Sequence, residues 1–183
     1  MNGHPGGIEH TRQMLILSEL TPPAKLLDMG AGKGETVQYL CNLGYEAIGI
    51  DLNSEITSHN CSADVCTLKT FVLQGDFLHP PFESENFDGI ISQCAFYVSG
   101  EPAKAFLAAY QLLKPDGILM ISDVCPRDIT LKSMAETAGF TVLHYEDQTT
   151  VWKEYYIEAI WRGTAQCFPC NQKMNYEMLI CKK

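Results

Sequence analysis

The spacing of hydrophobic and polar positions predicts a chain of alternating strands and helices. Short apolar runs predict strands over 24–27, 46–51, 70–74, 87–92, 118–121, 141–146 and 176–181. Apolar residues at helical spacing predict helices over 9–20, 35–43, 101–113, 130–138 and 151–162. The segment 54–68 has no clear period, and we expect a short helix and a loop there. This alternation is typical of an α/β fold with a doubly wound parallel sheet.

A glycine-rich turn joins the first predicted strand to the helix over 35–43. It reads Gly30-Ala31-Gly32-Lys33-Gly34, so the glycines recur at every second position. Glycines let a backbone approach a ligand, and a helix start offers free N–H groups, so the turn predicts a nucleotide cradle. A dinucleotide fingerprint would place its third glycine where Glu35 stands, and that carboxylate would oppose a pyrophosphate. Asp28 can take a cationic amino group, so the turn favours S-adenosylmethionine over NAD.

Polar residues follow the ends of the predicted strands, where doubly wound sheets bind ligands. They are Asp28, Asp51, Asp76, Gln93, Cys94 and Asp123. An acid about 20 residues after the glycine turn suits both ribose hydroxyls, since a carboxylate accepts hydrogen bonds, and Asp51 stands there. As an alternative, Asp51 caps a helix. Leu52 is expected below the adenine, Asp76 at its amino group and Phe77 against the ring.

Composition narrows the classes of partner. The 183 residues are 46% hydrophobic and 19% charged, and they carry a net charge of -9. We expect one globular domain over 1–183 and no nucleic-acid or membrane partner, because an acidic surface repels phosphate-rich surfaces. The first residues lack the features of a secretory signal, which predicts a cytoplasmic protein whose 8 cysteines are thiols.

Together these motifs resemble the class I S-adenosylmethionine-dependent methyltransferases over nearly the whole chain. The matching stretches are Leu27–Gly34, Gly49–Asp51, Gly75-Asp76, Phe87–Ile91 and Leu113–Gly117. In the last of these, Asp116 departs from the usual Pro-Gly-Gly turn. The chain is most similar to small prokaryotic members that open with His-Pro-Gly-Gly, which stands here as His4–Gly7. More distantly it is similar to ubiquinone/menaquinone-type and arsenite methyltransferases.

The resemblance implies a Rossmann-like seven-stranded sheet whose last strand is antiparallel. It also implies S-adenosylmethionine as cofactor and a small-molecule acceptor. The predicted cofactor-binding residues are Asp28, Gly30, Ala31, Gly32, Gly34, Asp51, Leu52, Asp76, Phe77 and Gln93. The segment 147–175 exceeds the family's usual short hairpin, and we expect it to form a cap on the substrate side. The segment 1–23 is expected to form a lid arm and a helix, or else a solvated arm.

The acceptor side is less defined by the sequence. Ser92-Gln93-Cys94-Ala95 stands where some amino-methylating enzymes of bases and glutamine carry Asn/Asp-Pro-Pro-Tyr, which argues against those enzymes. Tyr97, Asp123 and His10 are candidate acid/base groups. Each has an ordinary alternative role, in the core, as a cap or in solvent. The substrate candidates are His4, Cys94, Phe96, Tyr97, Cys125 and Trp152.

The cysteines suggest one alternative chemistry. Cys94 and Cys125 are expected near the ends of adjacent strands, and Cys167 and Cys170 lie in the expected cap. Converging thiolates would suit a thiophilic metalloid such as arsenite, whereas buried thiols commonly serve only in packing. A single Cys-x-x-Cys is half a zinc site, so no metal is predicted. Two further alternatives are a non-catalytic protein that holds S-adenosylmethionine and an NAD-dependent reductase.

Overall fold

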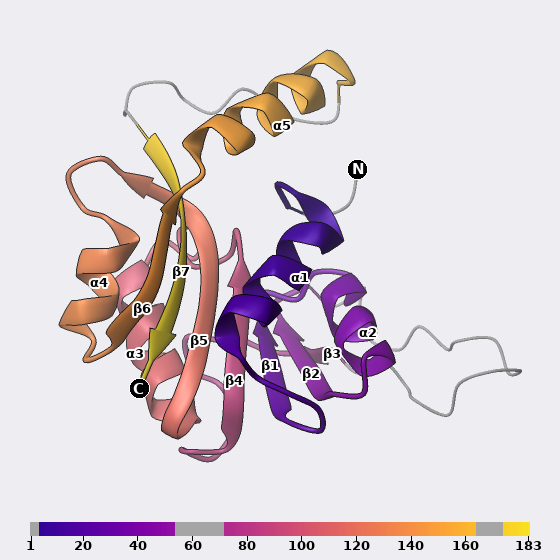
Figure 1. The fold of residues 1–183 in the computed structure, drawn as a ribbon, viewed down its shortest axis with the longest axis vertical. Coiled ribbons are helices and arrows are strands. Elements are labelled where there is room, and N and C mark those ends of the chain that lie inside the picture. Colours follow the sequence, from indigo (N-terminus) through magenta and orange to yellow (C-terminus); the bar gives the residue numbers. More distant parts are fainter. Residues whose placement is uncertain (1–3, 54–71, 164–173) are drawn as a thin grey trace, which may run out of the picture.

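The computed structural model describes residues 4–53, 72–163 and 174–183, which form one seven-stranded sheet with helices on both faces (Figure 1). The strands are β1 (Lys25–Met29), β2 (Glu46–Asp51), β3 (Val72–Gln74), β4 (Phe87–Gln93), β5 (Leu113–Pro126), β6 (Thr141–Asp147) and β7 (Met174–Lys182). The helices are α1 (Gly7–Ser18), α2 (Glu35–Asn42), α3 (Pro102–Leu112), α4 (Leu131–Thr137) and α5 (Thr149–Trp161). The predicted elements are therefore present; the prediction for 54–68 lies outside the described residues.

The strand order is β3-β2-β1-β4-β5-β7-β6, and β7 runs antiparallel to both of its neighbours. This arrangement confirms the predicted doubly wound sheet with an antiparallel last strand. It also brings the carboxyl ends of β1, β2 and β4 to one edge, because these strands pair in parallel. That edge is the expected place for a ligand.

Two apolar layers hold the helices against the sheet. Met14 and Leu15 of α1 pack on one face with Ile91 and Met120. On the other face, α3 and α4 pack around a buried cluster that includes Phe106. Because successive side chains of a strand point to opposite faces, each strand contributes side chains to both layers.

The extensions of β1 and β5 beyond their predicted ends affect the site. β1 continues through Asp28, which pairs with Gly49 and Ile91, so this carboxylate lies inside the strand. The pairing of β5 with β4 ends at Ser122, which lies opposite Gln93. The antiparallel pairing of β5 with β7 continues to Pro126, so the strand extends that far. The prediction that Ser122 and Asp123 end the strand is therefore wrong. The predicted turn over 114–117 also belongs to β5.

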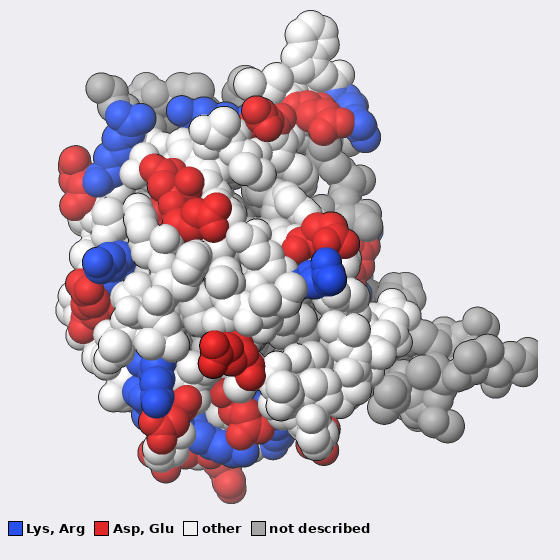
Figure 2. All heavy atoms as spheres, viewed as in Figure 1, with Lys and Arg blue, Asp and Glu red and all other residues white. Residues whose placement is uncertain are grey.

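The molecular surface mixes charges of both signs. On the face in Figure 2, basic side chains lie beside acidic ones. Ion pairs join Lys104 to Glu101 and Lys182 to Asp116. None of the helices in the described stretches has the length and apolar character needed to cross a membrane.

Candidate functional site

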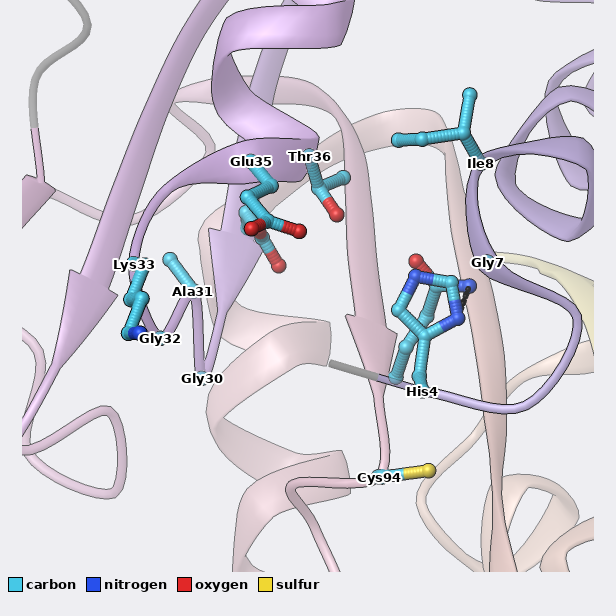
Figure 3. A pocket seen from close by; sticks show the side chains of 12 residues that line it. His4, Gly7, Ile8, Gly30, Ala31, Gly32, Lys33, Glu35, Thr36 and Cys94 are labelled. Atoms are coloured by element: carbon cyan, nitrogen blue, oxygen red, sulfur yellow. Dashed lines mark hydrogen bonds between the residues drawn. The ribbon is translucent and has the colours of Figure 1, made fainter. Parts of the chain in front are cut away.

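A cavity of about 460 Å³ opens between the glycine turn and the start of α1 (Figure 3). Its wall combines the end of β1, the turn, the first residues of α2, the end of β4 and the N-terminal segment. The lining residues are His4, Gly7, Ile8, Asp28, Gly30, Ala31, Gly32, Lys33, Glu35, Thr36, Gln93 and Cys94. Residues that are far apart in the sequence therefore share one pocket at the carboxyl edge of the sheet.

The glycine turn depends on backbone conformations that favour glycine. Gly30, Gly32 and Gly34 have φ angles of 86°, 52° and 78°. A Cβ on Gly30 would lie 2.2 Å from the Cβ of Ala95, whereas a Cβ on Gly32 would meet nothing within 4 Å. The turn is thus packed from behind at Gly30 and open at Gly32, as a cradle for a ligand requires.

Asp51 braces this turn from the end of β2. One carboxylate oxygen accepts a hydrogen bond from the Gly32 N–H at 2.8 Å, and the other accepts from the Asn53 N–H at 2.9 Å. The backbone N–H groups of Gly30 and Ala31 donate to the carbonyl oxygen of Ile50. An ionised carboxylate offers about four acceptor positions, so Asp51 retains capacity for hydroxyl donors.

The cavity wall carries two carboxylates on its cradle side. Asp28 is 5% exposed, and burial, with a further contribution from the Asp51 charge, raises its pKa to about 7. Glu35 stands in the first turn of α2, and Figure 3 shows it beside Thr36, across the cavity from His4. With Lys33 as the cation in the wall, acidic groups outnumber basic ones, which favours a cationic ligand over a pyrophosphate.

A family model described as a methyltransferase domain matches residues 27–121, just over half of the chain. The chain belongs to this methyltransferase-domain family. The matched range includes the glycine turn, the last three residues of β1 and all of β2 and β4, so the residues that define the family also form most of the cavity.

One comparison of sequence and one of fold accompany this match. Phosphoethanolamine N-methyltransferase of Plasmodium falciparum is 30% identical over 154 residues, which are 80% of this chain and 58% of that protein. The chain therefore spans less than two thirds of that relative's length. Phosphoethanolamine N-methyltransferase 2 of Haemonchus contortus, solved with S-adenosyl-L-methionine, superimposes with a TM-score of 0.74 at 18% identity, covering 98% of this chain and 53% of that one.

The same fold also occurs in an enzyme named for different chemistry. The [4+2]-cyclase SpnF superimposes with a TM-score of 0.74 at 16% identity, covering 96% of this methyltransferase-family chain and 80% of that one. At these identities the likeness concerns the fold, and the chemistry has to be argued from the site.

Half of the predicted cofactor-binding residues line the cavity of this chain. These are Asp28, Gly30, Ala31, Gly32 and Gln93. Two more do not line the cavity but support it: Gly34 is the N-cap residue of α2, and Asp51 accepts a hydrogen bond from the Gly32 N–H of the turn. Sequence reasoning did not name Gly7, Ile8, Lys33, Glu35 and Thr36 as binding residues. Glu35 and Thr36 could have been predicted as binding residues, because they begin the helix directly after the glycine turn.

The three residues expected around the adenine lie outside the cavity wall. Leu52 is 68% exposed. Asp76 accepts a hydrogen bond from the Leu78 N–H and contacts His79, and the His79 contact, together with that hydrogen bond, lowers the pKa of Asp76. Phe77 is buried and stacks on Phe96 at 5.9 Å, and its predicted place against the adenine stays a prediction.

The substrate candidates separate into wall and core residues. His4 and Cys94 line the cavity. Phe96 is fully buried between Phe77 and Phe106, so its prediction as a pocket residue is wrong. Trp152 stacks on Tyr156 within α5 and does not reach the cavity wall.

Cys94 and Cys125 face different layers of the molecule. The Cys94 thiol lies 3.5 Å from the Tyr176 hydroxyl, on the side of the sheet that carries α1, whereas Cys125 is buried in the layer beneath α3 and α4. Burial raises the pKa of each thiol to about 12, which keeps both protonated. The prediction that both face the pocket is wrong, and a thiolate site built on this pair has no geometric basis. Cys167 and Cys170 lie outside the described residues.

Two of the three acid/base candidates, His10 and Asp123, use their side chains in structural hydrogen bonds, and Tyr97 takes part through its backbone N–H. The Nδ1–H of buried His10 donates to the Pro5 carbonyl oxygen at 3.1 Å, and its Nε2 lies 3.2 Å from the Met178 sulfur. Asp123 accepts hydrogen bonds from the N–H groups of Tyr97 and Val124. Burial raises the pKa of Asp123 to about 6, although these hydrogen bonds oppose the rise. None of the three lines the cavity, and their assignment as acid/base groups stays a prediction.

Proposed function

We propose that the chain binds S-adenosylmethionine at the glycine turn and transfers its methyl group to a small-molecule acceptor. The observation that carries the proposal is the acidic cavity in front of an open glycine cradle, formed by Asp28, Gly32 and Glu35. When bound, the cofactor supplies a methyl group already activated by a sulfonium. Asp28 and Glu35 would hold its cationic end, and Asp51 would accept from the ribose hydroxyls.

The N-terminal segment and α5 complete this proposal as a lid and a cap. His4, Gly7 and Ile8 contribute directly to the cavity wall. Burial, and after it the charge of Cys94, raise the pKa of Tyr155 in α5, and this electrostatic influence of a wall residue supports a cap role for the helix. Closure by these segments would exclude water and hold an acceptor against the methyl group.

Two names among the comparisons indicate the first acceptor to try. Both phosphoethanolamine enzymes methylate an amine according to their names, so phosphoethanolamine and ethanolamine head the panel. The alternative is a protein that holds S-adenosylmethionine without transferring its methyl group. The fold does not exclude this alternative, because it is shared with an enzyme named as a cyclase.

The direct test is calorimetric titration of ligand-free protein with S-adenosylmethionine, its demethylated product and NADH. We expect micromolar binding of the first two and none of NADH, because Glu35 opposes a pyrophosphate. Release of demethylated product on adding an amine would then establish transfer. Binding without release on any acceptor favours the non-catalytic alternative, and absence of all binding contradicts the proposal.

Replacing Asp51 with asparagine should weaken S-adenosylmethionine binding by roughly tenfold or more. The carboxylate accepts from two backbone N–H groups, and an amide presents only one oxygen, so one donor loses its partner and the turn loosens. Titration calorimetry of this variant measures the loss. Glu46→Gln, an exposed change at the opposite end of β2, is the matched control and should bind as the wild type does. Equal affinity in the two variants would refute the role of Asp51.

A further inference from the structure

The His4 ring occupies a fixed position in the cavity wall. It is half-buried, lies across the cavity from Glu35, and packs 6.2 Å from the ring of His10. Its Nδ1 lies 3.2 Å from the Pro5 carbonyl oxygen and 3.3 Å from the side-chain nitrogen of Gln93. These two neighbours hold the same ring nitrogen, so the ring cannot turn without losing both.

This environment selects one tautomer of His4. A carbonyl oxygen only accepts, so the Pro5 contact requires a proton on Nδ1. As placed, the Gln93 nitrogen faces His4 and the Gln93 oxygen accepts from the Thr11 hydroxyl at 3.0 Å. The oxygen and nitrogen of an amide exchange places on a half turn, and the turned Gln93 oxygen accepts from the His4 Nδ1–H while its nitrogen donates to the Thr11 hydroxyl. The contact between His4 and the Pro5 carbonyl is a hydrogen bond only when Nδ1 carries the proton, and the turned Gln93 amide then satisfies its contacts with His4 and Thr11 as well. Nε2 is then left with a free lone pair.

The free nitrogen faces the ligand space. Figure 3 shows one ring nitrogen joined to Gln93 by the dashed line, and the other turned toward the side of the cavity where Glu35 and Thr36 lie. Among the described residues no hydrogen bond is formed by Nε2. Burial lowers the pKa of His4, against the smaller opposing influence of the Pro5 hydrogen bond and the Glu35 charge, so the ring is neutral near pH 7. The other ionisable groups around this space are Asp28, Lys33, Cys94 and His10.

We propose that His4 is the general base of the transfer reaction, its Nε2 taking the proton that the acceptor must lose. This inference rests on the proposed methyl transfer and assigns it a proton acceptor from the N-terminal segment. The acceptor class is then a group that carries a removable proton, such as an ammonium or a hydroxyl, rather than a thioether or a tertiary amine. The N–H or O–H bond of the acceptor breaks, its electron pair stays on the acceptor as the attacking lone pair, and the proton forms a new bond to Nε2. The imidazolium afterwards releases this proton to water.

The first test does not depend on turnover. Histidine ring NMR of the 15N-labelled protein, with the His4 signals assigned by their loss in His4→Asn, reports tautomer and charge directly. We expect an Nδ1-protonated neutral ring near pH 7 and a pKa below the usual 6.5. A ring protonated on Nε2, or one charged near pH 7, overturns the proposal.

The second test compares binding with turnover on the same variants. His4→Asn retains an amide near the Pro5 carbonyl but lacks a base, so it should bind S-adenosylmethionine as the wild type does and lose about 100-fold or more in turnover of phosphoethanolamine or ethanolamine. His144→Asn, on edge strand β6, is the matched control and should lose nothing. Equal turnover of His4→Asn and wild type overturns the assignment of His4. A wild type that fails to bind S-adenosylmethionine instead contradicts the proposed function, so the two failures are distinct.

Discussion

Replacing Asp28 with asparagine is expected to stabilise the ligand-free protein above pH 7 while weakening S-adenosylmethionine binding. The Asp28 carboxyl is buried beside Asp51, and its pKa rises from 3.8 to about 7. Asparagine has nearly the same shape without the charge. The substitution therefore removes the cost of a buried charge and, at the same time, a partner for a cationic ligand.

The direction in which the free energy of unfolding changes with pH follows from the protons that the folded and unfolded states bind. Between pH 3.8 and about 7 the folded state holds a proton on Asp28 that the unfolded state has lost, so the free energy of unfolding falls as pH rises through this window. Below the window both states are protonated, and the charge costs nothing. Above it the cost is complete, and it corresponds to roughly 4 kcal/mol at 1.36 kcal/mol for each pKa unit.

Urea unfolding of the wild type and Asp28→Asn at two pH values measures this effect. The variant should exceed the wild type by roughly 2 kcal/mol near pH 5 and roughly 4 kcal/mol near pH 8. Asp88→Asn is a control of opposite sign. Burial raises the Asp88 pKa, but the hydrogen bonds from Lys114 and Lys25 outweigh it and lower that pKa overall, so this control should destabilise. A gain for Asp28→Asn that does not grow with pH contradicts the explanation.

Calorimetry on the same variant completes the prediction. Loss of a charge-assisted contact to a cationic ligand should weaken binding by roughly 10- to 100-fold. Wild-type affinity should itself fall as pH drops below about 7, because the ligand must then displace the Asp28 proton. An affinity for S-adenosylmethionine that is unchanged in Asp28→Asn would remove this carboxylate from the site.

Replacing Gly30 with alanine should destabilise the protein by roughly 2–5 kcal/mol and abolish ligand binding. The added Cβ would lie 2.2 Å from the Ala95 Cβ, and the φ angle of 86° is unfavourable for alanine. Overpacking contributes about 1–3 kcal/mol and the left-handed backbone about 1–2 kcal/mol. Chemical unfolding and titration calorimetry measure the two losses.

Two matched variants separate these causes. Ala95→Gly in the Gly30→Ala background removes the clash and should recover the overpacking share, leaving the backbone strain. Gly32→Ala has a φ angle of 52° and meets nothing within 4 Å, so it should lose less stability but still obstruct the cavity. If the double variant recovers nothing, the contact with Ala95 is not what confines Gly30 to glycine.

The sequence determined the cradle because its requirements are local. Glycines at positive φ, a strand before them and a helix start after them are all specified within about a dozen residues, and Asp51 follows at the end of the next strand. The polar strand ends in turn predicted which edge of the sheet would hold the site. The antiparallel last strand was predicted from the family resemblance, and β7 is antiparallel in the structure. The order of the strands came only from the structure.

Only the tertiary structure decided which side chains reach the cavity. The long pairing of β5 with β7 drew Asp123 and Cys125 into the sheet, and Cys125 fell on the face opposite Cys94. Packing in the layer under α3 turned Phe77 and Phe96 inward, although both follow strand ends. His4 reaches the cavity through contacts with Pro5 and with Gln93, which lies 89 residues further along the chain. Long-range packing of this kind leaves no local pattern, because the face that a side chain takes depends on its neighbours in space.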